Sequence, residues 1–182
     1  MTGAGFAAST APVTPEAALA DPAAAAAAIN ARCPGVTVTA AVGCDQGSRR
    51  VAVLSIVIDP PQQLAHHGYP TERVAVVLDG NVRAFPAGDS AQAGRVFGHR
   101  NPTGEYCLFY ARDDPALTWR PEDGLEELLA ITQRHVAAEE YARRHDGAWP
   151  VEDAPHGEPA VGTHPIRSRA ARRAVREGTR TR

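Results

Sequence analysis

Apolar and polar positions alternate through the middle of the chain, and four segments have the composition of β-strands. They are residues 36–42, 50–58, 72–78 and a short segment with Val82 and Ala84, closed by Pro86. The 50–58 segment is apolar almost throughout, which is typical of a central strand buried on both faces. Asp79-Gly80-Asn81 favours a tight hairpin before the last strand. We therefore expect an antiparallel meander of about four strands.

Helical patterns flank this meander. Thr14-Pro15-Glu16 supplies a cap, a first-position proline and an acid, and alanine-rich sequence follows to Arg32. Pro22 interrupts it, so we expect one short helix or two turns broken there. After Pro121-Glu122-Asp123, apolar residues recur at helical spacing until Asp146-Gly147, with Glu and Arg opposite; they are Leu125, Leu128, Leu129, Thr132, Val136 and Tyr141. The pattern predicts an α+β fold with helices packed on an antiparallel sheet.

The length of 182 residues suits one domain with tails. We expect residues 1–14, which are small and polar, to be disordered, residues 15–160 to form the domain, and residues 161–182 to be a basic, disordered tail. Between the second and third strands, Gln62 to Pro70 is expected to be a polar loop in which His66-His67 is solvated.

Composition and charge exclude several classes of protein. No apolar run approaches the roughly 18 residues that span a bilayer, and the first nine residues do not resemble a secretory signal. Cys33, Cys44 and Cys107 are too widely spaced for a disulfide framework or a zinc ribbon, so we expect a reducing, cytoplasmic location. The net charge of -2 conceals seven arginines and one glutamate from Arg167 to Arg182, a basic arm that suits phosphate or an acidic protein.

Residues 86–118 contain many helix and strand breakers, and irregular segments of this length are more often functional than filler. Within them, His99-Arg100-Asn101-Pro102 is followed by Gly104-Glu105-Tyr106-Cys107-Leu108, and Trp119-Arg120-Pro121 then leads into the long helix. This order resembles the ubiquitin-conjugating enzymes, whose signature is His-Pro-Asn, then Gly-x-Ile-Cys-Leu, then Trp-Ser-Pro before a helix.

The triplet here is His-Arg-Asn, and the spacing from Asn101 to Cys107 is shorter than in the eukaryotic enzymes. These departures resemble the divergent bacterial members of the family, which often occur in anti-phage defence operons. The resemblance covers residues 36–145, and a second, shorter match lies in residues 147–157. It implies a ubiquitin-conjugating-like fold and a transferase that needs no metal or cofactor.

The resemblance also assigns roles to residues. Cys107 would carry an acyl group as a thioester, which passes to an amine without further energy input. Asn101 would donate to the oxyanion formed during attack, and His99 would support the loop. Further candidates, for orienting the acceptor or supporting the site, are Asp113, Asp114 and His156. The simpler interpretation of the two adjacent aspartates is that they are solvent-exposed charges with no catalytic role.

The implied partners are an activating-enzyme-like protein or the C-terminus of a donor. The donor would be a ubiquitin-like protein or a cyclic-oligonucleotide nucleotidyltransferase; a membrane or nucleic acid is not expected.

Other interpretations stay open. The chain could be an inactive member of the fold that binds such a partner, or a small hydrolase with Cys107 as nucleophile and His99, His135 or His156 as base. A nucleic-acid-binding role of the arginine tail would leave the Asn101–Cys107 segment unexplained.

All 19 basic residues are arginine, and the chain contains no lysine. Codon usage in a GC-rich genome explains this most simply. Alternatively, the absence protects a reactive thioester from side-chain amines of the same chain.

Overall fold

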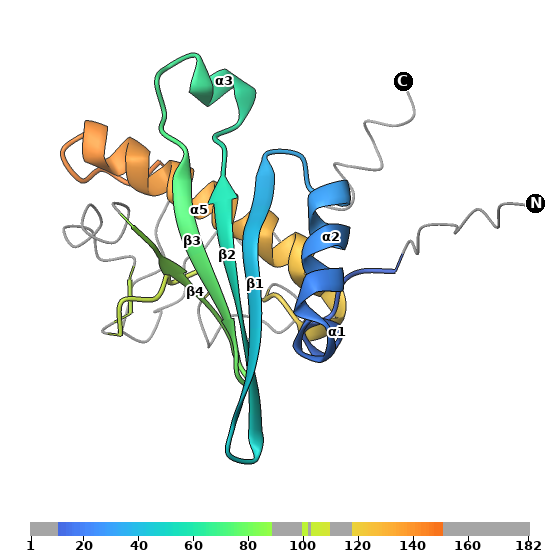
Figure 1. Ribbon diagram of the computed structural model, residues 1–182. Coiled ribbons are helices and arrows are strands. Elements are labelled where there is room, and N and C mark those ends of the chain that lie inside the picture. Colours follow the sequence, from blue (N-terminus) through green and yellow to red (C-terminus); the bar gives the residue numbers. More distant parts are fainter. Residues whose placement is uncertain (1–10, 89–99, 102, 110–117, 151–182) are drawn as a thin grey trace, which may run out of the picture.

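The computed structural model describes residues 11–88, 100–101, 103–109 and 118–150 (Figure 1). Its elements are α1 (Pro15–Ala20), α2 (Pro22–Arg32), β1 (Val36–Gln46), β2 (Arg49–Ile58), α3 (Gln62–Ala65), β3 (Glu72–Leu78), β4 (Val82–Pro86), the 3-10 turn η1 (Pro121–Asp123) and α5 (Gly124–Arg144). The four strands form one sheet in the order β1-β2-β3-β4, and each neighbouring pair is antiparallel. The predicted α+β class and the meander are confirmed.

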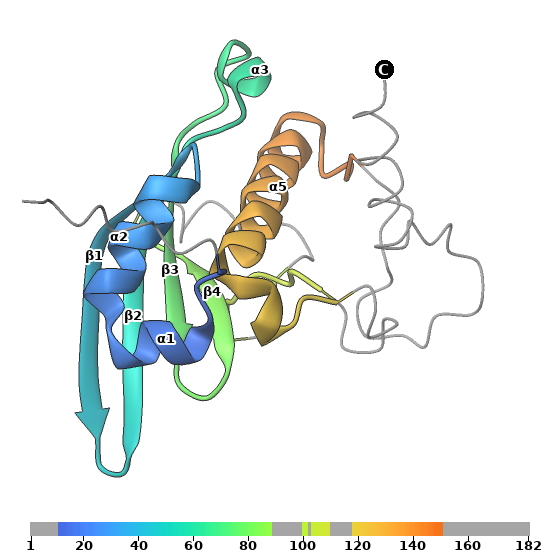
Figure 2. The ribbon, with the colours of Figure 1, turned by 90° about the vertical axis from the view of Figure 1, so that its right-hand side faces the viewer.

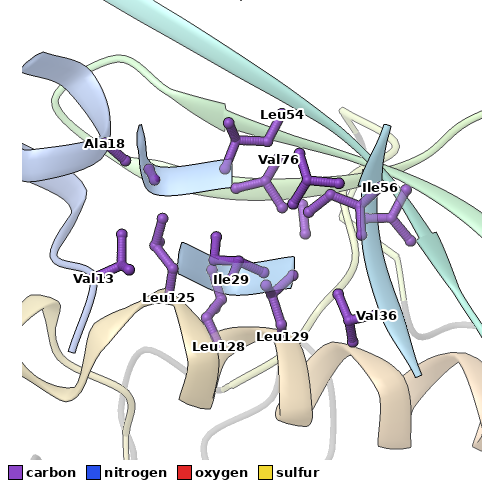
Figure 3. Close-up of a cluster of buried hydrophobic side chains, with 14 of the residues drawn as sticks. Val13, Ala18, Ile29, Val36, Leu54, Ile56, Val76, Leu125, Leu128 and Leu129 are labelled. Atoms are coloured by element: carbon purple, nitrogen blue, oxygen red, sulfur yellow. The ribbon is translucent and has the colours of Figure 1, made fainter. Parts of the chain in front are cut away.

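One face of the sheet carries the core. Figure 2 shows the long helix α5 to one side of the strands; α2 packs mainly on β1, and α1 contacts α2, β2 and β3. Buried side chains from the sheet, from the two N-terminal helices and from α5 meet in one core (Figure 3). They include Val13, Ala18, Ile29, Leu54, Ile56, Val76, Leu125, Leu128 and Leu129.

Strand β2 differs from its prediction. Its residues alternate between buried positions, such as Leu54 and Ile56, and half-buried or exposed ones, such as Val53 and Ser55. Burial on both faces was therefore the wrong interpretation of this apolar run. The second face is apolar in composition but remains partly open to solvent.

The alanine-rich segment forms two helices, as in the predicted alternative with a break at Pro22. Asp21 ends α1, and its Oδ1 accepts a hydrogen bond from the backbone N–H of Ala24 at 2.9 Å, which caps α2 immediately before Pro22. Packing also extends upstream of the expected start at residue 15. Val13 is buried, and its backbone N–H donates to the Glu126 carboxylate at 3.0 Å.

Three further details differ from expectation. The loop from Gln62 contains the one-turn helix α3, and β1 continues beyond residue 42 to Gln46. On α5, Tyr141 is half-buried, whereas the polar residues His135 and Glu139 are buried. In the described ranges, no helix combines the length and the apolar composition needed to cross a membrane.

Candidate functional site

Asn101 and Cys107 lie at the two ends of one short loop. Arg100 and Tyr106 form an antiparallel bridge that closes its base. Inside the loop, the Asn101 backbone N–H donates to the Glu105 carbonyl at 2.9 Å, and the Gly104 N–H donates to the Asn101 carbonyl at 2.8 Å. Gly104 has a φ of 87°, a backbone conformation that glycine adopts without the strain of a Cβ.

The loop is attached to the sheet through Tyr106. The Tyr106 backbone N–H donates to the carbonyl of Ala84 in β4 at 2.8 Å, and its side chain is buried. Cys107 follows directly and is half-buried. The half-buried cysteine therefore directly follows a residue that is anchored to the sheet.

Apolar residues after the thiol complete that base. Leu108 packs against the core, and the ring of Phe109 stacks on Trp119 with centroids 6.4 Å apart. The Trp119 indole N–H donates to the carbonyl of Gly124 at 2.8 Å, which ties this segment to the start of α5. Trp119 is thus a packing anchor between the loop and the helix.

One turn of α5 contacts both ends of the loop. The Arg100 guanidinium binds the Glu139 carboxylate with two hydrogen bonds, from Nε to Oε1 at 3.0 Å and from a terminal nitrogen to Oε2 at 2.8 Å. His135 Nε2 lies 3.5 Å from Glu139 Oε1, and the His135 ring meets the Tyr106 ring edge-on at 5.2 Å. The Arg100 guanidinium also lies 5.1 Å from the centre of the Tyr106 ring.

These contacts set the charges of the cluster. Burial disfavours ionisation of Glu139, but the close approach of His135 and the hydrogen bonds from Arg100 outweigh it and lower the pKa of the carboxyl group. Burial likewise disfavours the Arg100 cation, and the bond to Glu139 outweighs it and raises the pKa of the guanidinium. Burial, followed by the Glu139 charge, raises the pKa of Tyr106. The pair is therefore ionised at neutral pH, and the phenol is neutral.

The Asn101 side chain makes a contact that the sequence did not reveal. Its Nδ2 donates to Glu105 Oε1 at 2.7 Å. A primary amide has two N–H donors, so this contact fixes the side chain while leaving its second N–H as a candidate oxyanion donor.

Of the candidate residues, Asn101 lies inside the loop closed by the Arg100–Tyr106 bridge, and Cys107 is the first residue after that bridge. His99, Asp113, Asp114 and His156 lie outside the residues that the structure describes. His135 was considered only as a possible base for a hydrolase, and the structure places it against Glu139, Tyr106 and the Trp149 ring.

Sequence reasoning missed the cluster of Arg100, His135 and Glu139. A signal was available, because Glu139 lies three residues after Val136 and so continues the apolar face of α5 with a carboxylate. An acid at such a position needs a buried partner. The sequence did not identify Arg100 as that partner.

The other two cysteines lie in different surroundings. Cys44 is exposed on β1, and Cys33 is half-buried at the C-terminal cap of α2. Burial and the nearby Glu126 charge raise the pKa of Cys33, against an opposing contribution from Arg32. None of the three cysteines, all of which the structure describes, forms a disulfide. The described residues contain no group of three or more side chains suited to a metal ion.

In comparisons with known proteins, no protein-family description, no curated protein and no solved structure matches this chain.

Proposed function

We propose that the chain is a ubiquitin-conjugating-like acyl carrier that forms a thioester on Cys107. The observation that carries the proposal is the loop closed by the Arg100–Tyr106 bridge, with Asn101 directly inside the bridge and the half-buried Cys107 directly after it. The sequence motif supports it, as does the order of elements, in which a four-stranded meander precedes the loop and a long helix follows it.

The chemistry consists of two acyl transfers. The Cys107 thiolate attacks the activated C-terminal carbonyl of the donor, a carbon–sulfur bond forms, and the previous carrier leaves as a thiol. An acceptor amine then attacks the new thioester, which gives an amide and releases the Cys107 thiol. In both steps the oxyanion would accept from Asn101, a type of donor worth about 3 kcal/mol in other enzymes.

The donor follows from the same resemblance. We propose the C-terminus of a ubiquitin-like protein or of a defence nucleotidyltransferase, delivered directly or by an activating-enzyme-like protein. The runner-up function is an inactive member of the fold that only binds such a partner. A half-buried cysteine directly after the bridge that closes the Asn101 loop favours the active form.

The test uses a peptide with an activated C-terminal thioester, because the natural donor is unidentified. We expect the full chain to gain the mass of one peptide acyl group, and dithiothreitol should remove it. Cys107→Ser should give an ester that resists dithiothreitol, and Cys107→Ala should give neither product. Cys33→Ala and Cys44→Ser serve as matched controls that keep the labile adduct.

Each alternative predicts a different result. Continuous release of free peptide acid at many turnovers would favour the hydrolase. A Cys107 that reacts with neither the peptide thioester nor iodoacetamide in the folded chain, yet reacts after unfolding, would favour the inactive binding module. Retention of the labile adduct by Cys107→Ala would refute the assignment of the nucleophile.

A further inference from the structure

The buried ion pair between Arg100 and Glu139 connects α5 to the candidate loop. Both side chains are almost inaccessible, with exposed fractions of 9% for Arg100 and 2% for Glu139. Their contact is bidentate, with two hydrogen bonds of 3.0 and 2.8 Å that fix the plane of the guanidinium relative to the carboxylate.

Stability alone does not account for such a pair. Desolvation of two charges offsets most of their attraction, and well-packed apolar residues of similar volume are often equally or more stabilising. The property that a bidentate pair adds is a fixed geometry, since the arginine fork donates to a carboxylate in few orientations. The question is therefore what this geometry holds in place.

The position of the pair answers that question. Arg100 immediately precedes Asn101, and Tyr106, which lies against both the Arg100 guanidinium and the His135 ring, immediately precedes Cys107. Glu139 and His135 are one helical turn apart on α5. One turn of α5 thus contacts Arg100, which precedes Asn101, and Tyr106, which precedes Cys107.

We infer that Arg100 and Glu139 are a positioning pair that holds Asn101 and Cys107 in the geometry for acyl transfer, an inference that rests on the proposed function. The pair touches neither donor nor acceptor and acts through the loop. Its loss should lower the rate of thioester formation at saturating donor more than the apparent affinity for the donor.

A second ion pair on the same helix provides a matched control. Arg143 binds Glu72 at 2.8 Å, with exposed fractions of 19% and 10%, but it joins α5 to β3 instead of the loop. Removal of either pair costs one buried contact between α5 and the rest of the fold. The charges of Glu72 and Arg143 also act on Tyr106, but only the Arg100 pair includes a residue of the candidate loop.

The experiment compares R100M/E139L with R143M/E72L, both carrying C33A and C44S so that Cys107 is the only thiol. We expect both double variants to fold, with melting temperatures within about 4 °C of the parent. R100M/E139L should form the thioester with the peptide probe at least about ten-fold more slowly at saturation, whereas R143M/E72L should keep the parent rate. Should R100M/E139L fail to fold, E139Q replaces it and should show a smaller loss of the same kind.

Hydrogen exchange separates this inference from the proposed function. The Asn101 and Tyr106 amides, which donate to Glu105 and Ala84, should exchange at least about ten-fold faster in R100M/E139L, while β3 amides do not change. That result supports the positioning role even if the parent forms no thioester, an outcome that would reject the function alone. Unchanged exchange at these amides, or a parent-like rate of thioester formation in a folded R100M/E139L, would overturn the positioning role.

Discussion

The buried carboxylate of Glu139 gives the protein a pH-dependent contribution to stability. The pKa of Glu139 is lower in the folded chain because burial is outweighed by the close approach of His135 and by the hydrogen bonds from Arg100. An unfolded glutamate titrates near 4.3, so around this pH the unfolded chain binds more protons than the native one. The stabilisation is present above the unfolded pKa and is lost as the pH falls through the lower native pKa.

Glu139→Gln should therefore reduce the free energy of unfolding at neutral pH and flatten its decline toward acid. Urea unfolding at several values between about pH 7 and about pH 3 measures both effects. Glu127→Gln is the control, because Glu127 lies on the same helix with a side chain 40% exposed. A Glu139→Gln profile parallel to that of the parent would show that this carboxylate is not the linked group.

At this scale, sequence and structure agree where a local motif exists. Asn101 and Cys107 could be selected because Cys107 follows Asn101 at an offset of six positions within one recognisable segment. The Arg100–Glu139 pair joins residues 39 positions apart, so no local spacing reveals it. The position of Glu139 on the apolar face of α5 was an available signal that the sequence analysis did not use, and only the three-dimensional packing identified its partner.

Among the elements, the strands were predictable where one face is buried. β3 was predicted at its observed bounds because buried and less buried residues alternate along it. β1 extends to Gln46, although Cys44 and Asp45 are exposed there, because pairing with β2 continues without any apolar signal. Backbone pairing at a projecting hairpin is not encoded in side-chain hydrophobicity, so the end of this strand could not be predicted from the pattern.

The start of α5 depends on Gly124, whose φ is 80°. A Cβ at this position would lie 2.5 Å from the Pro12 Cβ and 2.8 Å from a Glu126 carboxylate oxygen. Gly124→Ala should lower the free energy of unfolding by about 2 kcal/mol or more, since it combines backbone strain with a clash. Chemical denaturation gives the value.

Gly47→Ala is the matched control for that variant, because Gly47 also has a positive φ, 64°, but nothing lies within 4 Å of its Cβ position. It should show the backbone cost alone, about 1 kcal/mol. Equal losses in the two variants would mean that the segment around Pro12 does not pack on the start of α5.

For the whole molecule, the topology concentrates the candidate chemistry at one place. The chain leaves the sheet at β4, and the loop with Asn101 and Cys107 binds back to β4 through Tyr106 and to α5 through Arg100. The thiol therefore lies beside the junction of sheet and helix, where both layers restrict its backbone. Under the proposed function, any nearby amine would compete for an acyl group on Cys107.

The absence of lysine from all 182 residues acquires a testable meaning in that setting. An arginine guanidinium stays protonated at neutral pH, whereas a lysine amine near a thioester attacks it once deprotonated. We expect Arg112→Lys, five residues after Cys107 in the sequence, to convert the peptide adduct from a dithiothreitol-labile thioester to a stable amide.

Arg50→Lys is the control, since Arg50 lies on the part of β2 that extends beyond its pairing with β3 (Figure 1). Intact mass after reduction, with peptide mapping of the modified residue, distinguishes the two products. If Arg112→Lys and Arg50→Lys both lose the adduct completely on reduction, the missing lysines reflect codon usage and have no protective role.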